Sequence, residues 1–600
     1  MEAESETLRR RGCSFTKADF LPEESFKSWG NYAKALGETG TRLKDRVFTR
    51  SLDEIEVTEI KAQSKNDMKK SLNWWDLIWL GIGSVIGTGI FVLTGQEAKL
   101  DAGPAVILSY AVSGLSALLS VFCYTEFGVE IPAAGGSFAY LRVEMGDFVA
   151  FIAAGNIIFE YVISCAAVAR SWSSYLATLL NHNPNDFRIV ISNLPQDFNQ
   201  LDPIAVCIIS IVCVAAVFST KFSSRFNYIA SVLHLAIIVF IIIAGLTQAN
   251  VKNYTDFTPY GVHGIFKASA VLFFAYVGFD AVSTMAEETK NPGRDIPIGL
   301  VGSITITIVV YCLMAATLCL MQPYDQIDPD APFSIAFKAT GMDWAKYIVA
   351  FGALKGMTSV LLVSAMGQAR YLTHIARTHM APPCLGYVHE KFGTPINATI
   401  VMLVATAVIA LFTDLNVLAN LLSISTLFIF MLVAIALLIR RYYASGFTSS
   451  RHQILFITFI LVILASSIAI AALWAMEVAS WIPFLITVIV WFLSTIGLRV
   501  FVPQAREPKV WGVPLVPWLP SASIAINIFL LGSIDAQSYT RFAIWTGGLL
   551  LYYLFFGLHA SYDAAREFSD KRAEAAKQLR KIEEGSATKS QMGDDMNACG

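Results

Sequence analysis

Four ionisable residues fall inside long apolar stretches of this sequence: Glu160, His234, Asp280 and Lys355. A charged side chain is costly at membrane depth, so each of them points to a functional role. A carboxylate there can neutralise a cationic ligand or hold a proton. A histidine titrates near neutral pH and can bind and release a proton in each working cycle. These residue types suit the binding of charged groups and protons within a membrane.

Each of these residues also has a structural alternative. Glu160 either opposes a cationic ligand side chain, holds a proton, or only partners another buried polar group. His234 is either a proton-binding residue or a neutral histidine hydrogen-bonded between helices. Asp280 follows a glycine by two positions and is expected to cap a short helix, where an N-terminal carboxylate is favoured. Lys355 would repel a cationic ligand, so we expect it to pair with an acidic residue, to point away, or to mark a broader specificity.

Glycine interrupts the apolar segment 75–95, which would otherwise form one helix. Its glycines stand at positions 81, 83, 87, 89 and 95. Unwound backbone at membrane depth is tolerated only where it lines a protein-walled cavity. Bare amide N–H groups there suit a carboxylate, and bare carbonyls suit an ammonium group. The segment therefore indicates a carrier for a small zwitterion, with close helix packing as the alternative use of the glycines.

The first interruption is expected to bind both ends of such a ligand. The N–H groups of Ile86, Gly87 and Gly89 would receive the α-carboxylate, and Thr88 would add a hydroxyl. The carbonyls of Val85 and Ile86 would receive the α-ammonium group.

A second glycine-interrupted segment, 273–282, begins five apolar spans later. Its break around Phe274, Val277 and Gly278 is expected to share in binding the ammonium group, and Phe274 or Tyr276 would close over the ligand as an aromatic gate. Two broken helices, each the first of five, indicate an inverted-repeat transporter.

Composition restricts the class of protein. The chain has 600 residues, 55% of them hydrophobic, and a mean hydropathy of +0.56, which indicates an integral membrane protein. It has no basic domain of the kind that binds nucleic acid. No catalytic motif supports an enzyme, and no cofactor is expected. His374 and His379 lack acidic or thiolate companions nearby in the sequence, so we expect them to be solvated rather than metal ligands.

The apolar runs predict fourteen spans of an all-α membrane protein. They lie at 75–95, 105–124, 149–175, 203–219, 227–247, 264–285, 298–321, 346–370, 396–412, 416–439, 454–474, 480–500, 516–534 and 541–560. The bias of Lys and Arg toward alternate loops places both termini in the cytosol. The sequon at Asn253 then lies outside and is a candidate for glycosylation. Helices are also expected near 26–36 and 53–62.

Several long motifs resemble the amino acid–polyamine–organocation superfamily. They are GSVIGTGIFVLTG at 83–95, FFAYVGFDAV at 273–282, AEETKNPGRDIP at 286–297, and GQARYLTHIAR at 367–377 followed by GTP at 393–395. The segment VPLVPWLPSASIAIN at 513–527 resembles the extension of cationic amino acid transporters, and LKGMTS at 354–359 resembles their plant members.

The resemblance implies a 5+5 inverted-repeat core of the leucine-transporter type. The expected division is a cytosolic segment at 1–70, the transport core at 71–440, four additional helices at 441–560 and a cytosolic tail at 561–600. It also supports the backbone roles given above, and it places His234 where proton-coupled relatives carry a lysine. In the loop after the second broken helix, Glu287, Glu288, Arg294 and Asp295 either form ion pairs of an inner gate or are only solvated.

The expected function is proton-coupled import of cationic L-amino acids (Arg, Lys, His) by alternating access. A broad or neutral amino acid permease is the alternative, and an amino-acid-sensing receptor is a further one. The expected partners are the amino acid, protons and membrane lipid, without nucleic acid, and the sequence sets no oligomeric state. The expected location is the plasma membrane, with the vacuolar membrane as the alternative.

Overall fold

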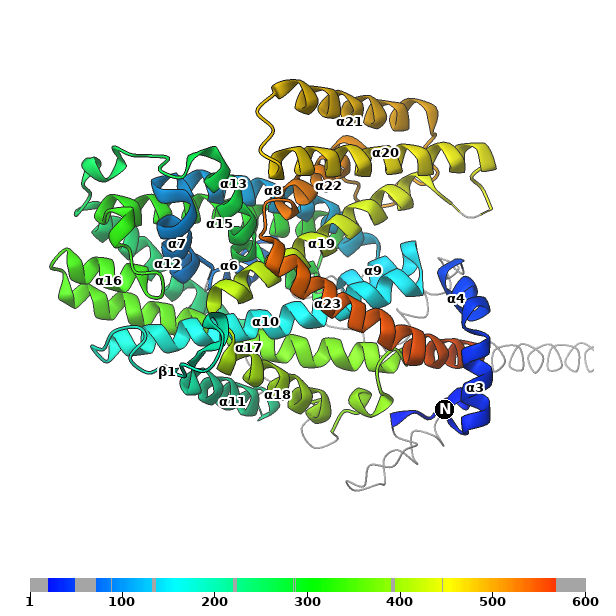
Figure 1. The fold of residues 1–600 in the computed structure, drawn as a ribbon, viewed down its shortest axis with the longest axis horizontal. Coiled ribbons are helices and arrows are strands. Elements are labelled where there is room, and N and C mark those ends of the chain that lie inside the picture. Colours follow the sequence, from blue (N-terminus) through cyan, green and yellow to red (C-terminus); the bar gives the residue numbers. More distant parts are fainter. Residues whose placement is uncertain are drawn as a thin grey trace, which may run out of the picture.

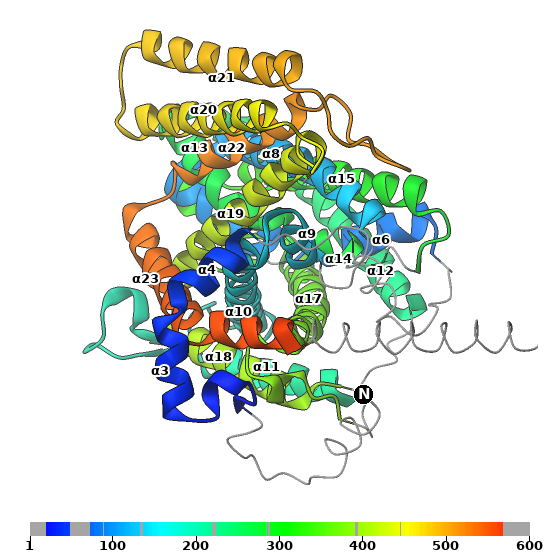
Figure 2. The same ribbon diagram turned by 90° about the vertical axis from the view of Figure 1, so that its right-hand side faces the viewer.

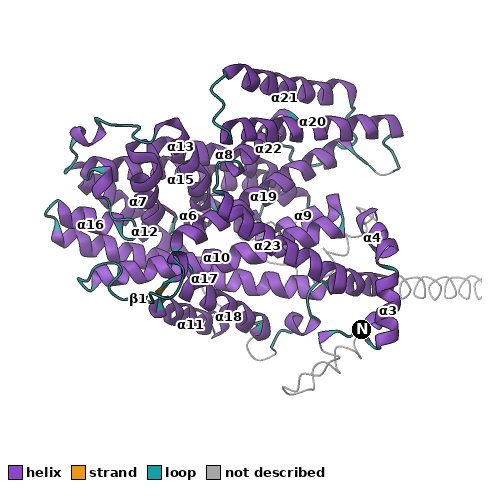
Figure 3. Cartoon of the chain, viewed as in Figure 1, coloured by secondary structure: helices purple, strands orange, loops and turns teal. Residues whose placement is uncertain are grey.

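The computed structural model of the chain describes residues 20–48, 72–87, 89–131, 136–218, 224–283, 285, 288–389, 394–444 and 446–567. Helices dominate these residues, as Figure 3 shows. Within them, one small sheet pairs β1 (Ile189–Val190) antiparallel with β2 (Gln200–Leu201). The predicted all-α fold class is therefore confirmed.

The first predicted span is a helix interrupted near its middle. It consists of α6 (Trp74–Val85), the π-helical turn η2 (Gly89–Leu93), α7 (Thr94–Glu97) and a further π-helical turn, η3 (Ala98–Ala102). Asn73 caps α6 in a reciprocal capping box with Asp76, which fixes where the helix begins. Ile86 leaves the helix with extended backbone angles, φ −74° and ψ 106°. The chain thus unwinds where glycine predicts it.

The sixth predicted span is broken as well. It consists of α13 (Gly261–Leu272), the 3-10 turn η7 (Phe273–Tyr276) and the short helix α14 (Asp280–Ser283). Gly278 lies between η7 and α14 with φ +114°, a conformation that L side chains rarely adopt. Glycine here allows the chain to turn between the two half-helices.

Each remaining predicted span coincides with one helix. In chain order these are α8 (Val106–Glu130), α10 (Asp147–Leu179), α11 (Pro203–Phe218), α12 (Ser224–Leu246), α15 (Pro292–Met321), α17 (Asp343–Arg377), α18 (Ile396–Phe412), α19 (Leu415–Tyr442), α20 (Ser450–Ala475), α21 (Trp481–Phe501), α22 (Trp518–Leu531) and α23 (Ala536–Tyr552). Within the described ranges, eight helical segments are long and apolar enough to cross a membrane. The chain is a multi-pass membrane protein, while the number of fourteen crossings and the division into four parts stay predictions.

Short elements precede the first span, connect later spans or continue the last one. They are η1 (Glu24–Phe26), α3 (Trp29–Gly37), α4 (Thr39–Phe48), η4 (Gly103–Ala105), α9 (Gly136–Met145), η5 (Gln196–Phe198), η6 (Val251–Tyr254), η9 (Tyr324–Gln326), α16 (Pro332–Ala339), η10 (Pro383–Gly386) and η11 (Tyr553–Gly557).

Two long helices, α10 and α17, form the centre of the fold. They contact each other along their length and run side by side in Figure 1. The outer half of the sixth span, α13, packs on α8, and α6 packs on α15. By contrast, α20 and α21 form a hairpin at the edge of the molecule, and α20 contacts α22 (Figure 1).

The segment before the first span docks across one end of the helix assembly, the end predicted to be cytosolic (Figure 2). Its ion pairs reach three different spans or their ends: Arg42–Asp563 at 3.2 Å, Arg46–Asp147 at 3.1 Å and Glu23–His379 at 2.6 Å. The expectation of a solvated His379 is therefore wrong, because the fold brings a distant glutamate to it. Helix α3 confirms the expected helix near 26–36, and the one near 53–62 falls outside the described residues.

Candidate functional site

The two interrupted helices meet at their breaks. A Cβ added to Gly89 would overlap the Cα of Ala275 in η7, and one added to Gly278 would lie 2.6 Å from the carbonyl oxygen of Ser84 in α6. Ordinary van der Waals contact of such an atom begins near 3.4 Å. Glycine is therefore required at both positions, because backbone approaches backbone there. The unwound segments form one continuous site rather than two.

Tyrosine hydroxyls from neighbouring helices hold the unwound backbone. The hydroxyl of Tyr311 on α15 lies 3.1 Å from the Val85 carbonyl and 3.0 Å from the Ala275 carbonyl, so it bridges the two breaks. On α8, the hydroxyl of Tyr110 lies 2.9 Å from the Gly89 carbonyl. A buried carbonyl outside a helix needs such a partner. The Val85 carbonyl, which is expected to receive an ammonium group, thus already accepts a hydrogen bond from the Tyr311 hydroxyl.

These two tyrosines did not stand out in the sequence. Tyr110 and Tyr311 lie inside the spans predicted at 105–124 and 298–321. A tyrosine hydroxyl within an apolar run needs a hydrogen-bond partner in the membrane, and this requirement could have identified both residues.

The two candidate gate residues have different surroundings. Tyr276 is fully buried, and its hydroxyl donates to the Tyr110 carbonyl on α8 over 2.8 Å. That bond holds Tyr276 toward α8. Phe274 has no hydroxyl to anchor it and is 6% exposed. Val277 ends the η7 turn with extended backbone angles and donates its N–H to the Phe274 carbonyl over 3.1 Å. Of the two, Phe274 is the less constrained.

Glu160 and Asp280 come together beside the second break. Glu160 lies on α10, and Asp280 is the first residue of α14, the half-helix that it was expected to cap. The two carboxyl groups lie close enough for each to affect the charge of the other, and Thr426 of α19 lies beside the Glu160 side chain. The rings of Tyr161 and Tyr371, 6.0 Å apart, lie in the same region. Two acidic side chains and two tyrosine rings thus lie near one another beside the second break.

His234 has a separate set of neighbours. Its ring stacks on Phe91 of η2, with centroids 5.6 Å apart and planes 15° apart. On the other side it packs against Gly356 of α17, where an added Cβ would overlap the ring. His234 is 5% exposed, and its Nε2 has no hydrogen-bond partner among the described residues. The ring therefore touches both the first broken helix and α17.

Lys355 precedes Gly356 on α17 and is partly buried. It is therefore adjacent in sequence to the glycine against which the His234 ring packs. Nearby on the same helix, Val360 approaches the first break, since a Cβ added to Gly87 would lie 3.0 Å from its Cγ2. Helix α17 thus contacts the first break at Val360.

Backbone pairing joins the predicted cytosolic ends of the two broken helices. The N–H of Leu72, just before α6, donates to the Glu288 carbonyl over 3.0 Å, and the N–H of Lys290 donates to the Leu72 carbonyl over 2.9 Å. Glu288 thus contributes its backbone to this junction, and Arg294 is exposed. Glu287 and, at the first break, Thr88 lie outside the described residues.

Asp295 and Asn253 have local partners. The Oδ2 of Asp295 accepts from the Asn291 N–H over 3.3 Å at the start of α15. The side-chain amide of Asn253 donates to the Leu320 carbonyl over 2.9 Å. Glycosylation of Asn253 would require that bond to open.

Comparison with known proteins decides the family. A family model described as "Amino acid permease" matches residues 72–501, and a model of the permease C-terminus matches residues 511–561. The chain belongs to the amino acid permease family. This family includes transporters rather than enzymes, as the sequence predicted.

Plant relatives of the permease cover nearly its whole length. It is 70% identical to "Cationic amino acid transporter 1" of Arabidopsis thaliana over 96% of its own length and 97% of the relative's. It is 52% identical to the vacuolar "Cationic amino acid transporter 8" of the same plant, over 94% and 96% of the two chains. It is also 37% identical to the "Methylthioribose transporter" of Bacillus subtilis, over 64% of this chain and 84% of the relative. The resemblance inferred from the motifs is confirmed.

Proposed function

We propose that this permease imports cationic L-amino acids by alternating access, coupled to protons. The observation that carries the substrate class is the meeting of Glu160 and Asp280 beside the glycine breaks. Two partly buried carboxylates that lie close together repel each other, and a cationic side chain between them would relieve that repulsion. The names of the plant relatives support the same class of substrate.

The unwound backbone would bind the groups common to all α-amino acids. The N–H groups of Ile86, Gly87 and Gly89 suit the carboxylate, with Thr88 adding its hydroxyl. The free face of the Val85 carbonyl, the Ile86 carbonyl and the carbonyls of the η7 turn suit the ammonium group. Phe274 is the better placed residue for closure over the ligand.

His234 is proposed as the proton-binding residue. Its Nε2 is buried without a partner among the described residues, and such an atom is costly unless it binds something during the cycle. Because the ring contacts both η2 and α17, a change in its protonation would be felt at the contact between the first broken helix and the central helices.

Alternation between outward and inward states would break the contacts at the ends of the broken helices. On the cytosolic side these are the backbone bonds of Leu72 with Glu288 and Lys290. We propose the plasma membrane as the location, with both termini cytosolic. A negative inside potential then favours uptake, since one unit charge crossing 100 mV gains about 2.3 kcal/mol.

Lys355 favours the second candidate, a broad amino acid permease. A positive charge on α17, at the position before the glycine that contacts His234, would weaken discrimination in favour of cations. The methylthioribose transporter shows that a relative's substrate need not be a cation.

Uptake of labelled arginine into cells that express the chain tests the proposal. It is measured at about pH 5.5 and 7.5, with and without a protonophore, in competition with lysine or leucine. Uptake that rises in acid, collapses with the protonophore and is blocked mainly by lysine supports the proposal. Equal block by leucine supports the broad permease. No accumulation despite surface expression rejects transport of arginine.

A further inference from the structure

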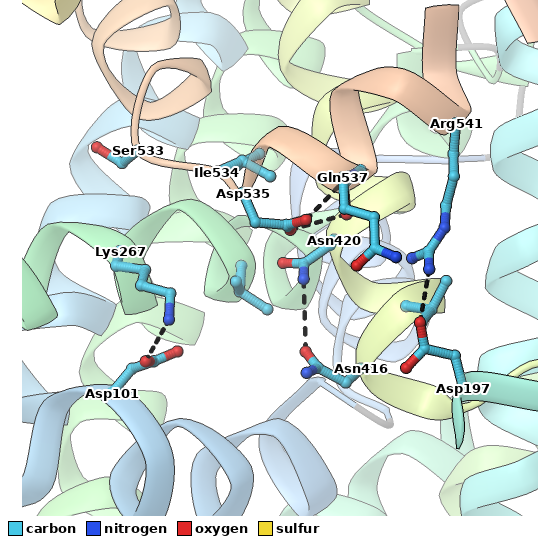
Figure 4. A pocket seen from close by; sticks show the side chains of 13 residues that line it. Asp101, Asp197, Lys267, Asn416, Asn420, Ser533, Ile534, Asp535, Gln537 and Arg541 are labelled. Carbon is cyan, nitrogen blue, oxygen red and sulfur yellow. Dashed lines mark hydrogen bonds and ion pairs between the residues drawn. The ribbon is translucent and has the colours of Figure 1, made fainter. Parts of the chain in front are cut away.

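A pocket opens on the predicted outer side of the molecule, away from the contact between the two breaks. Its volume is about 240 Å³. It lies between η3, α13, the start of α19 and the start of α23, as Figure 4 shows. Loops from distant parts of the sequence, including the one that carries Asp197, complete its wall. None of these positions stood out in the sequence.

Charged groups of both signs face this pocket. Lys267 Nζ lies 2.6 Å from Asp101 Oδ1, and the guanidinium of Arg541 lies 2.6 Å from Asp197 Oδ2. Asp535 accepts from the N–H and hydroxyl of Ser538, both over 2.8 Å. With three carboxylates and two cations, the lining has a net charge of −1.

Two amide side chains add uncharged donors and acceptors. Asn416 and Asn420, one turn apart at the start of α19, line the pocket beside Val417. Their side chains approach each other only at 3.5 Å, a weak contact that a ligand can replace (Figure 4). Amides of this kind bind guanidinium, ammonium or carboxylate groups equally well.

We propose that this pocket is an outer capture site for the dibasic amino acid before it reaches the glycine breaks. This rests on the proposed function. Arginine or lysine carries two cationic groups and one carboxylate. The net positive charge of such a ligand therefore balances the net negative charge of the pocket lining, which has three carboxylates and two cations. A neutral amino acid would leave one carboxylate of the lining without a cation.

The position of the pocket supports this role. Val271, which lines it, lies two residues before the η7 turn, and its carbonyl accepts from the Ser423 hydroxyl of α19 over 2.9 Å. The pocket therefore lies beside α13, the half-helix that leads to the second break.

The side-chain cation of the ligand is assigned to Asp535, since Asp101 and Asp197 each have a cation at 2.6 Å. Asp535 also caps α23, so removal of its side chain would disturb the helix. Asp535→Asn avoids this problem, because asparagine caps helices about as well as aspartate and only the charge is lost. Glu477→Gln is the matched control, since Glu477 is exposed in the turn after α20 and does not line the pocket.

The first measurement is the concentration dependence of arginine and leucine uptake. For Asp535→Asn we expect the KM for arginine to rise about fivefold, the scale of one partly exposed ion pair. Vmax for arginine, KM for leucine and both values in Glu477→Gln should stay at the wild-type level. An unchanged arginine KM at normal surface expression overturns the assignment.

The second measurement is equilibrium binding of labelled arginine to the purified full chain in lipid nanodiscs. Two arginines at saturation per wild-type chain, with one of the two sites bound about fivefold more weakly in Asp535→Asn, support the capture site. One arginine per chain in both proteins overturns it. If the wild-type chain moves no arginine, the proposed function fails, and the binding measurement still decides whether the pocket holds a dibasic amino acid.

Discussion

Gly89→Ala should disable transport because it separates the two broken helices. The added Cβ would lie 2.5 Å from the Ala275 Cβ and overlap the Ala275 Cα. Since ordinary contact begins near 3.4 Å, the two segments must move apart by roughly 1 Å. The obstructing Cα belongs to the backbone, so no change of rotamer can relieve the overlap. Overpacking of this kind costs about 1–3 kcal/mol.

The separation would also disturb the tyrosine that bridges the breaks. Tyr311 contacts carbonyls of both segments, at 3.1 Å and 3.0 Å, and a shift of roughly 1 Å takes at least one of them out of hydrogen-bonding range. A lost buried hydrogen bond costs about a further 1–3 kcal/mol. We therefore expect arginine uptake to fall at least tenfold in Gly89→Ala, with a lowered melting temperature of the purified protein.

Gly547→Ala is the matched control. Gly547 lies within α23, and an added Cβ there meets no atom within 4 Å. Uptake and melting temperature should stay at the wild-type level or rise slightly, because alanine favours helix. Uptake is measured per molecule at the surface, from biotinylated protein. Wild-type uptake and stability in Gly89→Ala would refute the close contact between the breaks.

Four further substitutions test other parts of the molecule. Glu160→Gln should lower uptake of arginine about tenfold more than uptake of leucine, because it removes one of two carboxylates beside the breaks; equal loss for both substrates would reject a counter-charge role. His234→Ala should flatten the pH dependence of uptake at normal surface expression, and an unchanged pH profile would remove His234 from the proton route. Arg42→Ala should loosen the N-terminal segment from Asp563 and speed limited proteolysis within residues 20–48, and Asp563→Asn should do the same to a smaller extent. If both variants are as resistant to protease as the wild type, this ion pair does not hold the segment.

Much of the architecture could be predicted from the chain because the bilayer restricts what a spanning segment can be. An apolar run must satisfy its own backbone as a helix, so run length gives the spans directly. The two glycine-rich interruptions were visible for the same reason. The structure shows both to be unwound, at Ile86 with extended angles and at Gly278 with φ +114°.

Contacts between segments could not be predicted in this way. Nothing local to Glu23 or His379 indicates that they pair, since they are 356 positions apart in the chain. The same holds for Glu160 and Asp280, whose proximity depends on how α10 packs against the sixth span. It holds also for Tyr311, which touches both breaks only because α15 lies beside them.

The sequence by itself determined the membrane setting, the helical class and the positions where helices must break, because hydropathy and glycine act over a few neighbouring residues. Only the tertiary structure decided which carboxylates lie close together, which tyrosines contact the unwound backbone and which loops enclose the outer pocket. The physical reason is that hydrogen bonds and charge–charge interactions depend on distances of about 3 Å between groups. Such distances between remote segments are set by helix packing, which no single stretch of sequence contains.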